Sequence, residues 1–550
     1  MTLDGFLTFL TLIIAAYGIA TETMRLRMRL HTLHLALVSL TVFAIVIYFE
    51  TFAVFGRHCP QSVGTACRYL TINKLDDGSS PIPGWLAFAG VVIWICIALS
   101  ILAQRAVASW ALPTLQRLVD ELVVERRFAE LIKVAEPQID LLTRASKRKL
   151  LFANWHDRLR DLNPHDDSMG IELLKQLEIE TPPRTWRDDL RTWSRINLSR
   201  LAWLIPARRI EQEAADEILR VMHLTQPLVE FIALFRPATG VSFLKIPTES
   251  VHEFCDAYLV ALAADPKSTL YVEVERNQNV FGCNRYAFPQ SNRLLYFLLG
   301  DAKIAERLGI WKPIGEWLIV NLSSSRNPEY VKSLNLSSDS FEDEKWQDPC
   351  YTILRFFDLM VSAAEYQGIE WHMWLYYYPH FLDRLIKFYD DTGSDVDLLR
   401  EMPTRAAYLI HELFRVMRAW ILSVTDLDEG SPHLIMASVE PTHENGNIPK
   451  SAILAIGSCL LALFEAENVG ARLKADIFEG VVRTIDHLPA EGPLSKFRTV
   501  MIASVIRGGS RFAAGERPAY LVWLRAQYSE VDWVLRDRLG DFEASLGPQG

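Results

Sequence analysis

The chain has 550 residues, half of them hydrophobic, and a formal net charge of −10. This composition supplies enough apolar side chains for packed cores and excludes a chain that is disordered throughout. The acidic balance makes nucleic acid an unlikely partner, because gripping a phosphate backbone requires a broad basic surface.

Three apolar stretches near the N-terminus predict membrane-spanning helices. They extend over about residues 5–21, 32–56 and 84–103. A helix rises about 1.5 Å per residue, so about 20 residues are needed to cross a hydrocarbon core about 30 Å thick. The second and third stretches reach that length, whereas the first is marginal. We therefore expect residues 1–104 to form a multi-pass transmembrane anchor.

The distribution of charge predicts the orientation of this anchor. Met1–Asp4 lacks the basic residues that begin a signal peptide, and Arg25, Arg27 and Arg29 instead follow the first stretch. By the positive-inside rule, the loop that carries these arginines is cytoplasmic. The N-terminus and the 57–83 loop then lie outside, and the large C-terminal part lies in the cytoplasm at the cell inner membrane.

The cysteines predict the same orientation independently. Cys59 and Cys67 lie close together in the 57–83 loop, where an oxidising exterior lets them form a disulfide. The remaining cysteines are scattered without paired spacing, as expected of reduced cytoplasmic thiols. They are Cys96, Cys255, Cys283, Cys350 and Cys459.

Glu50 places a carboxylate inside the second apolar stretch, about six residues from its external end. An ionisable group in hydrocarbon is costly and usually faces a cavity, so Glu50 is a candidate intramembrane polar site that lines a pore or carries protons. The alternative is that Glu50 lies near the interface and reaches the headgroups beside Phe49 and Phe52. We favour this second interpretation.

After Ala103 the apolar residues recur at three- and four-residue spacing, which is typical of amphipathic helices. The pattern predicts a mainly α protein, with a helical stalk over 105–160 and an irregular or solenoid-like all-helical body over 161–550. Thr269–Val274 alternates and predicts a strand. Ser451–Phe464 is the most apolar piece of the body, but it is too short to span a membrane and predicts a buried core helix.

Two polar segments predict loops within the body. Residues 322–349 are rich in Ser, Asn and acidic side chains, and residues 426–449 have a similar composition. Loops of this length in a compact protein are more often functional or disordered than ordinary connections.

The best local candidate for a ligand or partner site follows the predicted strand. Amide and guanidinium side chains gather there around Gly282, and such groups recognise planar or phosphate-bearing partners through several hydrogen bonds. The candidate residues are Arg276, Asn277, Gln278, Asn279, Asn284 and Arg285. The alternative is a solvated loop whose amides cap neighbouring helices, with Ser291 opening the next helix.

Linear signatures of common enzymes are missing from the sequence. It contains no P-loop, dinucleotide-binding, zinc-protease, nucleophile-elbow or EF-hand motif. His252 with Cys255, and His411 with Glu412, lack a second pair at ligand spacing, so we predict neither a metal nor a cofactor. The aromatic segment Trp371–Phe388 fits a packed core or a membrane-surface helix.

These features together predict a membrane-anchored cytoplasmic sensor or scaffold rather than an enzyme. Its expected partners are the lipid bilayer and either another protein or further copies of the chain. Bacterial stress and defence proteins often combine such parts, which is an analogy of architecture alone. Two alternatives stay open. One is an oligomeric effector whose three membrane helices perturb or conduct across the bilayer, and the other is a membrane-bound enzyme without a linear motif.

Overall fold

The computed structural model divides the chain into two compact units, Met1–Met222 and His223–Gly550. It describes residues 22–32, 35–42, 44, 89, 92–97, 100, 107–147, 193–195, 197, 210–277, 285–370, 374–442, 446–509 and 517–547. Within these ranges all regular secondary structure is helical, and one isolated antiparallel bridge joins Ser337 and Thr404. The mainly α prediction is therefore confirmed for the described residues.

The first unit contains short helices whose starts follow from the sequence. Pro113 lies in the first turn of α6 and Pro137 in the first turn of η3, where the missing backbone N–H has no helical acceptor to lose. The elements are α2 (Glu22–Leu30), η2 (Ser109–Ala111), α6 (Leu112–Val124), α7 (Phe128–Ala135), η3 (Glu136–Gln138), α8 (Ile139–Ser146) and α12 (Ile210–Leu224).

The segment between the first two apolar stretches is the helix α2, although it was expected to be a loop. Leu26 and Leu30 are buried, and α2 packs on α7. On the outer face of α2, Arg29 Nη1 donates hydrogen bonds of 2.9 and 3.0 Å to the carboxylate of Glu121 in α6. The segment that carries the arginines is therefore part of the packed core of the first unit.

The second unit is a succession of helices, each packed mainly on neighbours in the chain. Its first half comprises α13 (Gln226–Phe235), α14 (Pro237–Leu244), α15 (Val251–Ala264), α16 (Thr269–Arg276), α17 (Arg293–Leu299), α18 (Ala302–Leu308), α19 (Trp311–Asn321), α20 (Pro328–Ser333), α21 (Phe341–Glu344), η5 (Lys345–Gln347) and α22 (Pro349–Tyr366). Its second half comprises η6 (Trp374–Tyr376), α23 (Tyr377–Lys387), α24 (Arg405–Leu422), η7 (Ser423–Thr425), η8 (Pro432–Leu434), α25 (Ile448–Glu465), α26 (Ala471–His487), α27 (Ser495–Arg507), α28 (Pro518–Glu530), α29 (Trp533–Asp537) and α30 (Gly540–Leu546).

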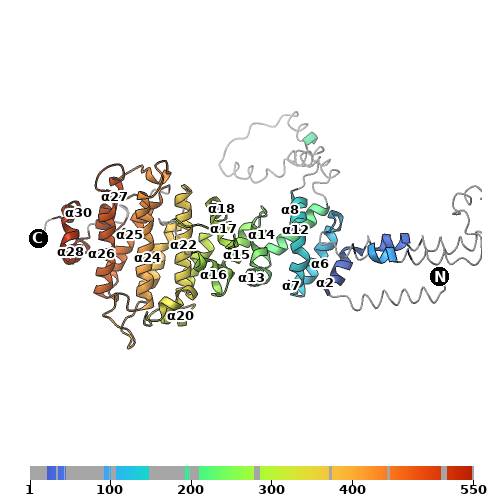
Figure 1. Ribbon diagram of the computed structural model, residues 1–550, viewed down its shortest axis with the longest axis horizontal. Coiled ribbons are helices and arrows are strands. Elements are labelled where there is room, and N and C mark those ends of the chain that lie inside the picture. The colour runs from blue at the N-terminus through green and yellow to red at the C-terminus, as the bar shows by residue number, and fades with distance from the viewer. Residues whose placement is uncertain are drawn as a thin grey trace, which may run out of the picture. The chain divides into compact units, whose positions relative to one another are not determined.

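The order of packing within this unit follows the order of the chain. α13 packs on α15, α15 on α19, α19 on α22, α22 on α24, α24 on α25, and α25 on α27. Figure 1 shows these helices following one another from α13 to α30. Each layer is therefore stabilised chiefly by the layers next to it, as in helical arrays.

The predicted strand over Thr269–Val274 is wrong, because these residues form α16. Leu270 and Val274 are four residues apart and both are buried, together with Tyr271. They share one face of a helix, whereas alternation would have placed Leu270 and Val272 on the same side of a strand. A window of six residues fits both periods, and packing against other helices decided between them.

The apolar segment over Ser451–Phe464 forms α25, a buried core helix, as expected. Among the described residues it is the single unbroken helix long and apolar enough to cross a membrane, with a mean hydropathy of 1.6 and 72% of its length buried. A Cβ at Gly457 would clash with Ser504 Oγ, so α27 approaches α25 closely. The protein's own helices therefore cover α25.

The two segments expected as loops contain short elements held by side chains. Residues 322–349 include α20, α21 and η5. In residues 426–449, Asn447 Nδ2 donates to the carbonyls of His433 and Ile435 at 2.7 and 2.8 Å. A polar composition indicated exposure, but these hydrogen bonds to the backbone depend on tertiary contacts that composition does not reveal.

Candidate functional site

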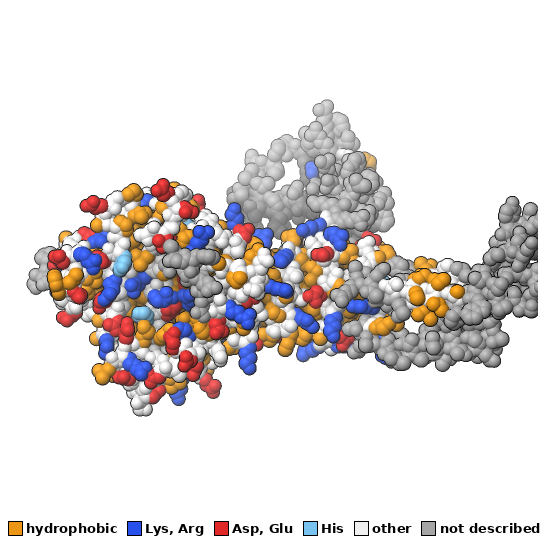
Figure 2. Space-filling model, viewed as in Figure 1, with side chains coloured by type: hydrophobic (Ala, Val, Ile, Leu, Met, Phe, Trp, Pro, Cys, Tyr) orange, Lys and Arg blue, Asp and Glu red, His pale blue; other side chains and the backbone are white. Residues whose placement is uncertain are grey.

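Two helical pieces of the predicted anchor are paired with each other. Residues 35–42 belong to the second apolar stretch and residues 92–97 to the third, and Trp94 Nε1 donates a 2.9 Å hydrogen bond to Ser39 Oγ. The large apolar side chains left exposed on these pieces are Leu37, Leu40, Val92, Ile93 and Ile97. Hydrophobic side chains gather on this described part in Figure 2. The two pieces are therefore joined by a polar contact and keep an apolar exterior.

The helical hydrogen bonds of α2 continue into the second apolar stretch. His31 N donates to Arg27 O at 3.0 Å, and Leu35 N donates to His31 O at 2.9 Å. These are the i to i−4 bonds of an α-helix. Because α2 also packs on α7, Leu35 at the start of the second stretch is linked through His31 and α2 to a helix of the predicted stalk.

The second unit contains a buried network of charges between α22 and α24. Asp358 lies at its centre and accepts hydrogen bonds from Arg355 Nη1 at 2.6 Å, Tyr286 OH at 2.8 Å and Trp420 Nε1 at 3.1 Å. Glu412 Oε1 lies 3.7 Å from Arg355 Nη1. Each carboxylate of the network therefore faces at least one cationic partner.

The electrostatics of this network favour charged, mutually paired groups. Burial acts to raise the pKa of Glu412, but the hydrogen bonds and charge of Arg415 outweigh it and hold that pKa below its usual value. Burial opposes the charged form of Arg355, yet the carboxylate of Asp358 raises the pKa of that guanidinium. A general acid or base works best with a pKa near the working pH, so these groups are better suited to stabilising the fold.

A second buried carboxyl belongs to Glu365, near the end of α22. Glu365 is 1% exposed and accepts a hydrogen bond from Ser423 Oγ. Burial raises the pKa of Glu365 well above its usual value, the hydrogen bond from Ser423 opposes the rise, and the charge of Asp358 adds to it. The fold therefore favours the protonated form of Glu365.

Glu365→Gln is expected to weaken the dependence of stability on pH. The unfolded chain loses the Glu365 proton near the usual pKa of 4.5, whereas the folded chain retains it. The free energy of unfolding therefore falls as pH rises from there toward the folded pKa. The glutamine side chain of the variant cannot ionise, so we expect a higher Tm than the parent at pH 8 and a similar Tm at pH 4.5.

Thermal unfolding of the detergent-solubilised full chain between pH 4.5 and 9 measures this effect. Glu429→Gln removes an exposed carboxyl and is the matched control for the loss of one charge. Parallel Tm profiles for Glu365→Gln and the parent would show that the buried carboxyl does not couple folding to pH.

The predicted partner loop contacts the protein itself where it is described. Asn277 is buried, and its Oδ1 accepts a hydrogen bond from Asn292 Nδ2 at 3.3 Å. The guanidinium of Arg285 lies 5.7 Å from the ring centroid of Tyr366. Arg276 ends α16. The other candidate residues, Gln278, Asn279 and Asn284, lie outside the described part of the chain.

Glu273 is a residue beside this loop whose role the sequence did not indicate. It is buried, and its carboxylate accepts the backbone N–H groups of Leu294 at 3.3 Å and Leu295 at 2.9 Å. A negative charge here satisfies free N–H groups and the dipole at the start of α17. The helix begins after Asn292, so the expected cap at Ser291 is wrong by one residue.

The two pairs of ligand-type residues do not form metal sites. Cys255 is fully buried in α15, and burial raises the pKa of its thiol, while His252 on the same helix is exposed. Glu412 beside His411 is already bound to Arg415. Nowhere in the described ranges do three or more His, Cys, Asp or Glu side chains come together as metal ligands.

The aromatic segment at the start of α23 belongs to the core. Trp374, Tyr378 and Phe381 are fully buried, and Tyr378 OH donates to the carbonyl of Leu354 at 3.1 Å. The packed-core interpretation therefore describes this segment better than a helix lying on a membrane surface.

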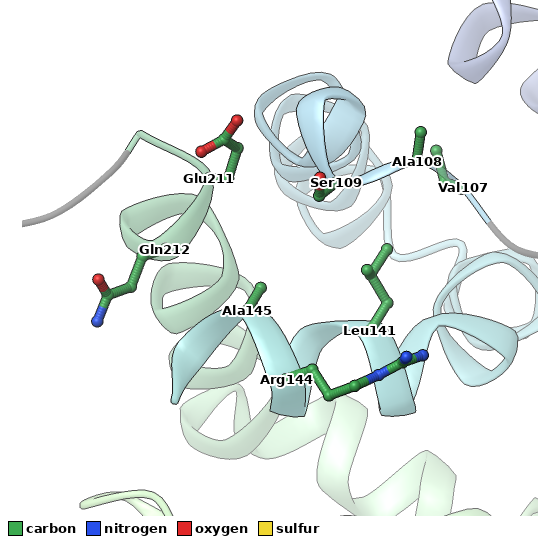
Figure 3. Close-up of a pocket in the computed structure, with 8 residues that line it drawn as sticks. All are labelled: Val107, Ala108, Ser109, Leu141, Arg144, Ala145, Glu211 and Gln212. Carbon is green, nitrogen blue, oxygen red and sulfur yellow. The ribbon is translucent and has the colours of Figure 1, made fainter. Parts of the chain in front are cut away.

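The first unit holds a hollow of about 460 Å³ beside α8. It is lined by Val107, Ala108, Ser109, Leu141, Arg144, Ala145, Glu211 and Gln212. Figure 3 shows Leu141 pointing toward Ser109, Gln212 pointing outward, and Arg144 extending along α8. Arg144 Nε donates to the carbonyl of Asp140 on its own helix at 3.1 Å. Four of the eight lining residues are aliphatic, and Arg144 and Glu211 are the charged ones.

The structure leaves Glu50, Cys59 and Cys67 outside the described residues. The buried network around Asp358, and Glu273 at the start of α17, stabilise the fold. The chain matches no protein-family model, no curated protein and no solved structure.

Proposed function

We propose that the protein is a membrane-anchored helical scaffold, with residues 1–104 crossing the bilayer and the body presented to cytoplasmic partners. The observation that carries this proposal is the pairing of residues 35–42 with residues 92–97 through Ser39 and Trp94, which leaves large apolar side chains exposed. Removing apolar surface from water stabilises a protein by about 25 cal/mol per Å². Side chains exposed to water do not gain this free energy, whereas side chains covered by lipid do.

The packing of α2 supports a cytoplasmic body. α2 lies between the first two apolar stretches and carries Arg25, Arg27 and Arg29. Because α2 packs on α7 and Arg29 binds Glu121, the arginines and the stalk that leads to the body belong on the same side of the membrane. The positive-inside rule makes that side the cytoplasm.

The body supports a binding role through its surface. A succession of helices offers an extended face to protein partners or to further copies of the chain. Its buried carboxylates Asp358 and Glu412 are paired with Arg355 and with the more exposed Arg415. The channel-forming alternative depends on Glu50, which lies outside the described residues, and the enzyme alternative depends on a site that no linear motif marks.

Cysteine labelling of intact cells with a membrane-impermeant maleimide tests the topology. Cys255, Cys350 and Cys459 are fully buried and cannot report on it, so the reporter for the body is Leu399→Cys at a position that is 80% exposed. We expect Cys59 and Cys67 to react in intact cells after reduction. We expect Leu399→Cys to react only after permeabilisation.

A background with Cys59→Ser, Cys67→Ser, Cys96→Ser and Cys283→Ser isolates the signal from position 399, because Cys255, Cys350 and Cys459 are fully buried. Labelling of Leu399→Cys after permeabilisation is the control for its accessibility. Its labelling in intact cells would place the body outside and overturn the proposed orientation.

A further inference from the structure

The ammonium group of Lys345 lies among three aromatic rings in the second unit. Its Nζ is 5.9 Å from the ring centroid of Trp346, 5.3 Å from that of Tyr351 and 5.7 Å from that of Tyr408. The rings come from η5, α22 and α24, and the side chain of Lys345 is 13% exposed. A cation within about 6 Å of an aromatic face is attracted by the ring. We call Trp346, Tyr351 and Tyr408 the aromatic cage, in which Tyr408 meets the ammonium with its hydroxyl end rather than with its ring face.

A carboxylate completes the aromatic cage. Glu342 forms an ion pair with Lys345 and accepts a 2.8 Å hydrogen bond from Tyr408 OH. Lys345 Nζ also lies 3.2 Å from Tyr408 OH, to which it donates. The side chain of Glu342 is 65% exposed, so this carboxylate marks the solvent side of the cage. Aromatic faces with a nearby anion are the chemistry that recognises alkylammonium groups.

The walls of the aromatic cage are held by contacts that do not involve Lys345. Trp346 packs edge-to-face on Tyr351 at 5.0 Å, and Tyr408 packs edge-to-face on Phe341 at 5.2 Å. Tyr351 is buried, and the carbonyl of Trp346 accepts a 3.0 Å hydrogen bond from Thr352. The cage is therefore preorganised, which lowers the entropic cost of binding a ligand in it.

Lys345 is the part of this arrangement that can move. Its ammonium is carried on a flexible four-carbon chain, and rotation about those bonds returns it to water without moving the backbone of η5. We propose that the aromatic cage is a binding site for an alkylammonium group of a small molecule or of a partner's lysine, and that Lys345 occupies it as a competing internal ligand. This site goes beyond membrane anchoring and is independent of the orientation of the chain.

Competition between Lys345 and an external ammonium group determines the apparent affinity of the site. An external ammonium group binds only when Lys345 leaves, so its apparent affinity equals the affinity of the open cage multiplied by the fraction of molecules whose cage is open. Shortening Lys345 removes the competitor and leaves Trp346, Tyr351, Tyr408 and Glu342 in place. The affinity of the cage for a free ammonium ion should then rise.

Ligand-detected NMR with tetramethylammonium as the probe tests this site in the full chain, held in a detergent without choline headgroups. We expect Lys345→Ala to bind tetramethylammonium at least tenfold more tightly than the parent. Choline should bind as well, whereas its neutral isostere 3,3-dimethylbutan-1-ol should not. A second arm with a trimethyl-lysine peptide distinguishes a protein partner from a small molecule by which probe binds more tightly.

Matched variants distinguish the effect of emptying the cage from the effect of removing the charge of Lys345. Lys345→Met keeps an unbranched side chain of similar length that fills the cage, so it should not gain affinity. Lys345→Ala combined with Trp346→Ala should lose the affinity that Lys345→Ala gained. Lys345→Ser provides a second open cage if the alanine variant loses its helical circular dichroism. Equal affinity in the parent and the open-cage variants, or equal binding of the neutral isostere, would overturn the proposal.

Discussion

Asp358→Ala is expected to lower the free energy of unfolding of the second unit by about 3–5 kcal/mol. The substitution leaves Arg355 buried without its nearest counter-charge, and Glu412, at 3.7 Å, compensates it only in part. It also removes the acceptor for Tyr286 OH and Trp420 Nε1. Unsatisfied buried donors and an unpaired buried cation are each costly, so the loss exceeds that of a typical single substitution.

Denaturant unfolding of the solubilised full chain, followed by circular dichroism and tryptophan fluorescence, measures this loss. Glu479→Ala breaks the more exposed ion pair with Arg483 and should change stability by less than about 1 kcal/mol. Combining Arg355→Met with Asp358→Leu removes both buried charges and should recover much of the loss. A loss for Asp358→Ala no larger than that for Glu479→Ala would show that the network contributes little.

Leu40→Asp and Ile93→Asp are expected to reduce retention in the membrane strongly. Both side chains are exposed on the helix pair, at 67% and 56%. If lipid covers them, an aspartate near the middle of a spanning helix costs about 2.5–3.5 kcal/mol. If water covers them, the same substitutions are neutral or improve solubility, so the sign of the effect separates the two environments.

The share of the chain that resists alkaline carbonate extraction measures this retention. Leu399→Asp introduces the same charge at a similarly exposed apolar position of the body and should leave the share unchanged. Full retention of Leu40→Asp and Ile93→Asp would argue against a membrane environment for the helix pair.

The helical character of the body could be predicted because only a helix places apolar residues at three- and four-residue spacing on one face over a long stretch. The core helix at Ser451–Phe464 could be predicted for the same reason, since its length and apolar character agree. Thr269–Val274 could not, because six residues are too few to separate the two periods. The helix α2 was missed because its arginines indicated only a charged connection, whereas its buried Leu26 and Leu30 depend on α7.

The polar sites of the second unit were hidden for a different reason. Arg355 and Asp358 are three residues apart in sequence and look like an ordinary surface pair on a helix. Only the packing of α22 on α24 brings Glu412 beside them. Lys345 and Tyr408 are 63 residues apart, so no local pattern could indicate the aromatic cage. Distant pairs of this kind become visible only when tertiary contacts are known.

The hydrogen bonds that join α2 to the second apolar stretch have a mechanical consequence. Within the proposed topology, Leu35 at the start of the second span moves with α2, because Leu35 N donates to His31 O and His31 N donates to Arg27 O. A span adjusts to bilayer thickness by tilting. That tilt would press α2 against α7 and exert a force on the hydrogen bond between Arg29 and Glu121. A change in the thickness or tension of the membrane would thereby exert a force on α7 and Glu121 without any ligand.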